Sequence, residues 1–406
     1  MSGAQQKHSS LLGERLGGEG STASPTGEPQ RNPVTGQAAD GFSAQPGRPA
    51  GAAPAGAAPD LDWTAFKAQV HTVLTEYFQS HTARARAYSP AFGVLWEQMA
   101  EATLGGKWMR PKLVYLAYGA FGGGNWRAGA ELAAAFEVLH AALLVHDDVI
   151  DRDFVRRGAP TLGAAYRDMA ATLGQNAQDA EHAGFAAAII AGDLLLTGSL
   201  RLAGTAAKNH PNSALILGAV HEAIFASAAG ELDDLLFSLG GLAAQMPEVL
   251  KMERLKTAVY SFETPLRAGA LLAGESVSTA DALATVGRDI GIAYQVIDDV
   301  LGTFGQSSET GKSVDSDLRE GKRTILTTYA AGSPEFAAML ESFRNGQAQT
   351  GELREVLHQI GARNFAVELA ESLINDALGR AVELELPPTL YAELSNICDY
   401  VLTRRN

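Results

Sequence analysis

Residues 131–153 read ELAAAFEVLHAALLVHDDVIDRD, and this stretch decides the expected fold. Its apolar residues recur at intervals of three and four, which is the period of a buried or half-buried α-helix. The same period returns in FKAQVHTVLTEYF at residues 66–78, and alternating β-branched runs are almost absent from the chain. We therefore expect an all-α protein, built as a single large helical bundle around a central cavity.

Two regions of the chain differ in composition. Residues 1–60 are rich in Gly, Ala, Pro and Ser and have no apolar period. Such a segment cannot bury enough apolar surface to offset the entropy lost on ordering, so we expect a disordered tail. Residues 61–406 contain no second linker of this kind, and we expect one helical domain there.

Charge and cysteine content argue against several classes of protein. The chain has 32 Lys and Arg against 46 Asp and Glu, a net charge of −14, which repels nucleic acids and anionic membranes. Charges interrupt the apolar runs before the roughly 18 residues that a membrane-spanning helix needs. The single cysteine, Cys398, allows neither an internal disulfide nor a cysteine-rich zinc site. We expect a cytoplasmic protein with no transmembrane segment and no nucleic-acid partner.

An acidic cluster ends the helix predicted at residues 131–146. Asp147 and Asp151 are four residues apart and share one helical face, with Asp148 beside them. Their charges repel one another, and negative charge is unfavourable near the C-terminal end of a helix dipole. A cation would relieve both penalties, and oxygen ligands suit magnesium, which substrate phosphates often complete. A solvated acidic helix end is the alternative interpretation.

A second acidic pair and three basic segments point to related chemistry. Asp298 and Asp299 also end an apolar helical pattern, GIAYQVIDDVLGTFG at residues 291–305. Facing helices of a bundle can present such carboxylates to metals. Basic residues occur in GGKWMRP (105–111), RRGAPT (156–161) and GKSVDSDLREGKRT (311–324). Magnesium with Arg and Lys binds diphosphates, although surface salt bridges are the commoner fate of such residues.

Two Glu-x-x-His patterns suggest a different metal site. Glu137 with His140, and Glu355 with His358, match the spacing found in di-iron carboxylate bundles. That site needs two further inward Glu residues, and it leaves the Asp pairs and the basic segments unexplained. The diphosphate site is therefore the better interpretation.

With these motifs taken together, the chain from about residue 61 to its end resembles the trans-isoprenyl diphosphate synthases of the polyprenyl synthetase family, and most of all bacterial geranylgeranyl diphosphate synthases. The family's DDxxD followed by RRGxPT is matched at residues 147–161, and its GGKRxRP is matched as GGKWMRP. The resemblance implies the isoprenoid synthase fold, a homodimer and three magnesium ions per active site.

The resemblance also assigns a role to each matching residue. It places the metal ligands at Asp147, Asp148, Asp151, Asp298 and Asp299. It places the allylic diphosphate against Arg156, Lys256, Thr257, Gln295, Lys312 and Lys322. It places isopentenyl diphosphate against Lys107, Arg110, His140 and Arg157. The residues expected to act most directly in catalysis are Asp147, Asp148, Asp151, Arg156, Lys256, Asp298 and Lys312.

The implied reaction is a 1'-4 trans condensation of isopentenyl diphosphate with an allylic diphosphate. The allylic C–O bond ionises with magnesium assistance, the double bond of isopentenyl diphosphate attacks the cation, and a proton then leaves. Two residues depart from the family pattern. Gly302 stands where the second motif has its third Asp, and Glu231 stands where the family has Gln.

Product length is expected to depend on the residues before the first Asp motif. These are Leu143, Ala142, Leu139 and Phe136, at four, five, eight and eleven positions before Asp147. A helical turn rises about 5.4 Å, close to one isoprene unit. Family members that stop at fifteen carbons commonly have an aromatic residue at one of the two nearest positions. Ala142 and Leu143 are not aromatic and leave room, so with Phe136 as a floor the resemblance predicts geranylgeranyl diphosphate. Packed core is the alternative interpretation of Leu139 and Phe136.

Three other functions remain open at this point. A longer-chain polyprenyl diphosphate synthase would share every motif. A class I terpene cyclase shares the fold and DDxxD, but it lacks an isopentenyl diphosphate site. A non-catalytic partner subunit of a heteromeric synthase typically loses Asp residues from the first motif, which this chain keeps.

Overall fold

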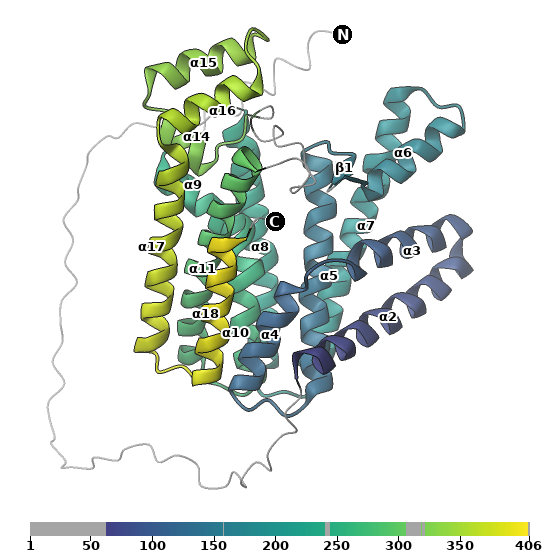
Figure 1. Ribbon diagram of the computed structural model, residues 1–406. Coiled ribbons are helices and arrows are strands. Elements are labelled where there is room, and N and C mark those ends of the chain that lie inside the picture. The colour runs from purple at the N-terminus through teal and green to yellow at the C-terminus, as the bar shows by residue number, and fades with distance from the viewer. Residues whose placement is uncertain (1–61, 157, 240–243, 306–317, 319–320, 405–406) are drawn as a thin grey trace, which may run out of the picture. The chain divides into compact units, whose positions relative to one another are not determined.

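The computed structural model describes residues 62–156, 158–239, 244–305, 318 and 321–404 (Figure 1). These residues are helical apart from loops and one antiparallel strand pair, β1 (Val155–Arg156) with β2 (Ala159–Pro160). The all-α prediction is therefore confirmed. The predicted tail, residues 1–60, lies outside the described residues, as do the predicted ligands Arg157 and Lys312. The division at residue 60 stays a prediction.

Helix α5 (Trp126–Ile150) carries the first acidic motif at its C-terminal end. It begins where the side chain of Asn125 accepts a hydrogen bond from the amide of Ala128, at 3.2 Å. Its apolar residues are buried on nearly every side, against α4 (Met109–Ala120) and α7 (Ala177–Ala206) among others. A helix that is apolar all round belongs in a protein interior. This burial fixes the place at which its last turn emerges.

A ten-residue π-helix interrupts the helical segment that spans residues 246–272. Helix α9 (Met246–Glu253) leads into η1 (Arg254–Glu263), and α10 (Thr264–Leu272) follows. π-helices are rare and usually a single turn, and they are frequent at functional sites. This one carries the predicted ligands Lys256 and Thr257.

Glycines let two neighbouring helices approach η1 closely. On α8 (Ser213–Ser238), a Cβ at Gly230 would lie 2.3 Å from the backbone nitrogen of Lys256. On α11 (Val277–Phe304), a Cβ at Gly291 would lie 2.7 Å from the Cβ of Ala258. Neither distance is possible for a real side chain, so glycine is required for this packing. The motifs on α8, η1 and α11 are thereby held side by side.

The remaining helices surround this centre (Figure 1). Helices α2 (Trp63–Tyr88) and α3 (Pro90–Leu104) pair with each other, and α6 (Leu162–Thr172) packs against α7. Helix α17 (Ala362–Glu383) packs along α11, and α18 (Pro388–Thr403) contacts both α11 and α4. The segment between α11 and α17 also contains α14 (Ile325–Ala330), α15 (Pro334–Arg344) and α16 (Thr350–Gln359).

Three helices are long and apolar enough to cross a membrane by length and composition, namely α5, α7 and α8. Charged residues do interrupt all three, as predicted, with Glu137 in α5, Asp193 in α7 and Glu222 in α8. Their composition alone still permits a span, so the absence of a transmembrane segment stays a prediction. The apolar window of α5 is 78% buried within the protein, whereas those of α7 and α8 are 44% and 39% buried. The core explains the composition of α5. An exposed apolar stripe remains on α8, formed by Phe225, Leu232 and Leu236 together with Leu239 at its C-cap.

Candidate active site

The first acidic motif lies where α5 ends. Asp147 and Asp148 are in the last turn, and Asp151 is the C-cap residue, whose amide donates to the carbonyl of Asp147 at 2.9 Å. Arg156, on β1, donates to Asp148 at 2.6 Å and to the carboxylate of Asp147. Burial raises the pKa of Asp148 to about 6, although Arg156 opposes this effect. The structure thus brings these four predicted residues together.

Lys256, on the π-helix, connects two helices that are far apart in sequence. Its Nζ lies 3.2 Å from Asp147 on α5, and 3.0 Å and 2.7 Å from Glu231 and Asp234 on α8. Burial alone would lower the pKa of Lys256, but the three carboxylates raise it well above its ordinary value. The side chain is therefore a fixed ammonium ion beside the first motif, and Thr257 is half-buried next to it.

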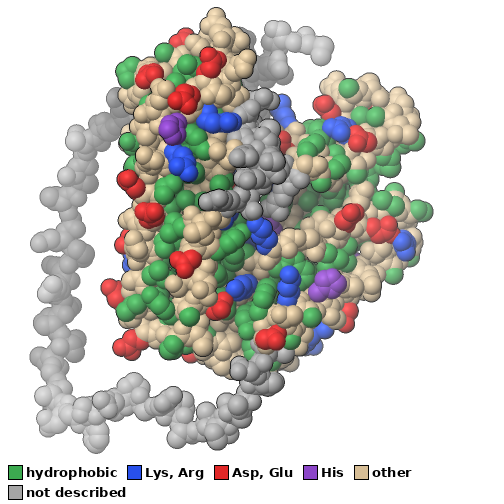
Figure 2. Space-filling model, viewed as in Figure 1, with side chains coloured by type: hydrophobic (Ala, Val, Ile, Leu, Met, Phe, Trp, Pro, Cys, Tyr) green, Lys and Arg blue, Asp and Glu red, His purple; other side chains and the backbone are tan. Residues whose placement is uncertain are grey.

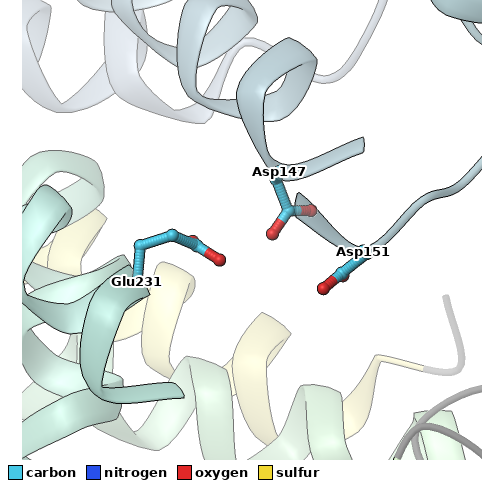
Figure 3. A group of neighbouring side chains, drawn as sticks. All are labelled: Asp147, Asp151 and Glu231. Atoms are coloured by element: carbon cyan, nitrogen blue, oxygen red, sulfur yellow. The ribbon is translucent and has the colours of Figure 1, made fainter. Parts of the chain in front are cut away.

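Asp147, Asp151 and Glu231 each offer an oxygen atom that lies within 4.8 Å of the others. Figure 3 shows the two Asp side chains at the end of α5 and Glu231 reaching toward them from α8. Carboxylate oxygens are the donors that magnesium prefers, so this donor set fits the predicted metal. Burial raises the pKa of Glu231 to about 7, with Lys256 opposing the shift. Sequence patterns had left Glu231 without a role.

Lys322 lies on the segment that follows α11 and reaches the same motif. Its Nζ is 2.5 Å from Asp151, a residue 171 positions earlier in the chain. Burial and the nearby Lys256 lower the pKa of Lys322, but Asp151 and Asp147 outweigh them and raise it overall. The predicted diphosphate ligand is therefore placed beside the first motif.

The second acidic motif lies near the end of α11. Asp299 is buried and accepts a hydrogen bond from Gln295 at 3.0 Å. Asp298 is half-exposed and pairs with Arg404 at 3.0 Å. Arg404 also donates to the carbonyl of Tyr294 at 2.7 Å and stacks on its ring. No pattern in the sequence had indicated that this residue near the C-terminus would reach the motif.

A buried carboxyl group lies between the two acidic motifs. Glu253, at the end of α9, is 3% exposed. Burial raises its pKa well above the ordinary value, and the charges of Asp299 and Asp234 raise it further. Asp234 in turn pairs with Lys256, which contacts Asp147. The two motifs therefore border one connected group of charges, as a shared site requires.

Arg110 and His140 meet at a tyrosine that the sequence did not single out. The hydroxyl of Tyr260, on η1, lies 3.2 Å from Arg110 and 3.2 Å from the Nδ1 atom of His140. Arg110 also donates to Ser261 at 2.8 Å. Two of the predicted isopentenyl diphosphate ligands are thus brought together, and both are oriented by the π-helix.

Lys107 has a different partner from this pair. It donates to the hydroxyl of Tyr400 on α18 at 2.9 Å. In Figure 2, several Lys and Arg side chains lie scattered among hydrophobic ones near the middle of the viewed face.

The four predicted chain-length residues lie on α5, on the turns that precede the first motif. Phe136, Leu139 and Ala142 are completely buried, and Leu143 packs partly buried against the core. The structure is consistent with both a wall of a substrate cavity and ordinary core packing, so their role stays a prediction.

The di-iron interpretation is wrong for the described part of the chain. Glu355 and His358 are exposed on α16, whereas Glu137 is buried on α5 and His140 contacts Tyr260. Among the described residues, one group of acidic, His or Cys side chains lies close enough to share a metal ion. It consists of Asp147, Asp151 and Glu231.

Comparison with known proteins gives concordant results. Residues 94–360 match the family model described as polyprenyl synthetase. The chain is 33% identical to geranylgeranyl diphosphate synthase of Sulfolobus acidocaldarius, over 68% of this chain and 80% of that protein. It is 32% identical to (2E,6E)-farnesyl diphosphate synthase of Mycobacterium tuberculosis, over 74% and 80%. A crystal structure of geranylgeranyl pyrophosphate synthase from Corynebacterium glutamicum, complexed with isoprenyl diphosphate and magnesium, superposes with a TM-score of 0.77 at 28% identity, over 85% of this chain and 100% of that one.

Proposed function

The chain belongs to the polyprenyl synthetase family, and we propose that it makes geranylgeranyl diphosphate. It is a trans-prenyltransferase that extends an allylic diphosphate with isopentenyl diphosphate. One observation carries the proposed site. Carboxylates of α5 and cations from three other segments, Arg156, Lys256 and Lys322, meet at one place. A magnesium diphosphate needs both kinds of group.

We assign the metal to the two acidic motifs, with three magnesium ions per site. Asp147, Asp148 and Asp151 hold it from the first motif, and Asp298 and Asp299 from the second. The clustering of Asp147 and Asp151 oxygens supports this assignment. When bound, magnesium supplies Lewis-acid stabilisation of the departing diphosphate.

The cations of the site exchange partners when substrate binds. In the described structure Arg156, Lys256 and Lys322 are each paired with carboxylates. With magnesium held by those carboxylates, the three side chains would be able to contact diphosphate oxygens, where negative charge grows as the allylic bond ionises. Thr257, Gln295 and Lys312 complete this subsite in the proposal.

The second substrate, isopentenyl diphosphate, is assigned to Lys107, Arg110, His140 and Arg157. The contacts of Arg110 and His140 with Tyr260 support a pre-organised arrangement. Arg offers a planar fork that matches a diphosphate, and Lys offers a point charge. The π-helix thereby orients groups of both substrate subsites.

Product length follows from the wall that α5 supplies. Ala142 and Leu143 leave space near the first motif, and Phe136 closes the path two turns deeper. The apolar side chains of this helix also exclude water, which would otherwise capture the allylic cation. Chain length has to be tested directly, because one relative of similar identity is a synthase of the fifteen-carbon farnesyl diphosphate.

The proposed assembly is a cytoplasmic homodimer. The α8 stripe of Phe225, Leu232, Leu236 and Leu239 is between 37% and 71% exposed. An apolar stripe of this kind favours pairing with another surface. If two copies pair through this face about a two-fold axis, each stripe would bury the other.

The test is incubation of the purified full chain with magnesium, labelled isopentenyl diphosphate and each of the five-, ten- and fifteen-carbon primers. The expected product, sized after dephosphorylation, is the twenty-carbon alcohol. Asp147→Asn should lower the rate by about a hundredfold or more, whereas the exposed Asp168→Asn on α6 should not. Release of a fifteen-carbon product would contradict the chain-length proposal, and no elongation would contradict the activity.

A further inference from the structure

Two residues of this chain differ from the family motifs in whether they carry a carboxylate, and they differ in opposite directions. Gly302 removes one from the second motif, and Glu231 adds one on α8. The two positions lie on different helices, so the change moves negative charge from α11 toward the first motif.

The position of Glu231 suits a ligand better than a surface carboxylate. Its side chain is only 20% exposed and lies beside Asp147 and Asp151, with oxygens of all three within 4.8 Å (Figure 3). Three converging oxygens are enough for magnesium, which keeps waters and substrate phosphates as its other ligands. A Gln at this position would offer a neutral oxygen, which binds a divalent cation more weakly.

The charges around this point are not balanced by the protein alone. Three cations, Arg156, Lys256 and Lys322, are paired with a larger set of carboxylates, namely Asp147, Asp148, Asp151, Glu231 and Asp234. When all eight are ionised, this group carries an excess of two negative charges. Without Glu231 the excess would be one. Glu231 therefore adds to the negative charge that attracts divalent cations to this point.

The contacts of Lys256 suggest how the Glu231 carboxylate could change its partner from an ammonium group to a metal ion. In the described structure the Lys256 ammonium lies 3.0 Å from Glu231 and occupies the space between this residue and Asp147. A bound diphosphate attracts that ammonium more strongly than a single carboxylate does. With a diphosphate bound, Lys256 would turn to it, and the Glu231 carboxylate would be able to contact the metal.

We propose that Glu231 is a direct magnesium ligand, shared with Asp147 and Asp151. This inference rests on the proposed function, because it concerns the same metal site. The competing role for Glu231 is that of a counter-ion for Lys256, without contact to metal.

The experiment titrates Mn²⁺ into the purified full chain and follows the free ion by electron paramagnetic resonance. An allylic thiolodiphosphate, which ionises very slowly, is present at saturation, so that binding is measured without turnover. Glu231→Gln should lower the Mn²⁺ affinity of one site by about tenfold or more. Glu222→Gln makes the same chemical change at an exposed position on the same helix. This variant should bind Mn²⁺ as the unmodified protein does.

Glu231→Asp separates ligation from charge. It keeps the negative charge but shortens the side chain, so a direct ligand should lose affinity by more than threefold, whereas a counter-ion effect should leave the affinity unchanged. Unchanged Mn²⁺ binding in Glu231→Gln, or in Glu231→Asp, would overturn the inference. Circular dichroism and the unfolding temperature show whether each variant is folded. If the unmodified chain binds Mn²⁺ but elongates no primer, the proposed function fails on its own and the ligand assignment stands.

Discussion

Gly230 on α8 lies against the backbone of Lys256, so close that a Cβ would be 2.3 Å from the amide nitrogen and 2.7 Å from the Cα of Lys256. This approach sets the distance between the carboxylates of α8 and the ammonium of the π-helix. The site therefore depends on a backbone contact as well as on its charged side chains.

Gly230→Ala should disrupt this contact. Because both neighbours are backbone, η1 must shift, and we expect a loss of about 1–3 kcal/mol in the free energy of unfolding. Turnover should fall more than stability alone explains, since Lys256 moves with η1. Urea denaturation and steady-state kinetics provide the measurements. Gly218→Ala, on the same helix with nothing within 4 Å of its added Cβ, is the control and should be neutral or stabilising. Equal behaviour of the two variants would contradict the packing argument.

Glu231 should make the metal-free protein less stable as pH rises. Its pKa is about 7 in the folded protein and near 4.5 otherwise, so the folded state holds more protons between these values. Stability then falls as pH rises from about 4.5 to 7. In a chelator, Glu231→Gln should be more stable than the unmodified protein at pH 8 by on the order of 1 kcal/mol, after allowance for partial exposure and charge coupling. Urea denaturation at pH 8 and pH 5 should show the difference shrinking at pH 5. A constant difference would mean that Glu231 does not titrate in this range.

Ala142→Phe should shorten the product. Ala142 is completely buried one turn before the first motif. An aromatic ring there would shorten the path of the growing chain, and so the product, by about one isoprene unit. Chromatography of the dephosphorylated alcohols is the measurement. The milder Phe136→Leu, two turns deeper, should instead lengthen the product. An unchanged length in both variants would assign these residues to the core alone.

Tyr260→Phe should affect isopentenyl diphosphate selectively. The substitution removes the hydroxyl that contacts Arg110 and His140, and loss of a hydrogen bond that orients a charged group corresponds to about tenfold in KM. The KM for the allylic substrate should stay the same, which serves as the internal control. Tyr88→Phe, on an exposed tyrosine, should change neither constant. A parallel rise in both KM values would indicate general damage to η1.

Arg404→Gln should lower the magnesium concentration needed for half-maximal activity. Arg404 is nearly buried and pairs with the half-exposed Asp298, so a metal ion at the second motif competes with its guanidinium. We expect a decrease of about two- to fivefold, typical of losing a partly screened ion pair. Arg404→Lys keeps the charge and should resemble the unmodified enzyme. A higher magnesium requirement in Arg404→Gln would mean that Arg404 supports metal binding.

Local patterns were sufficient to predict several of the residues that the structure brings together at the candidate site. The run from residue 131 to 151 predicted a buried helix that ends in carboxylates, and α5 has that form. Asp147, Asp148 and Arg156 are close in sequence, and their contacts form within one turn and one strand pair. The family motifs also predicted Lys256 and Lys322, and the structure places both beside the first acidic motif.

The sequence by itself determined the helical class, the acidic motifs and the family, because apolar period and short motifs are properties of neighbouring residues. Only the tertiary structure decided that Glu231 would converge with Asp147 and Asp151, that Tyr260 would join Arg110 to His140, and that Arg404 would reach Asp298. These contacts join segments separated by up to 150 residues. They depend on how closely α8, η1 and α11 pack, and a helical period contains no information about that distance.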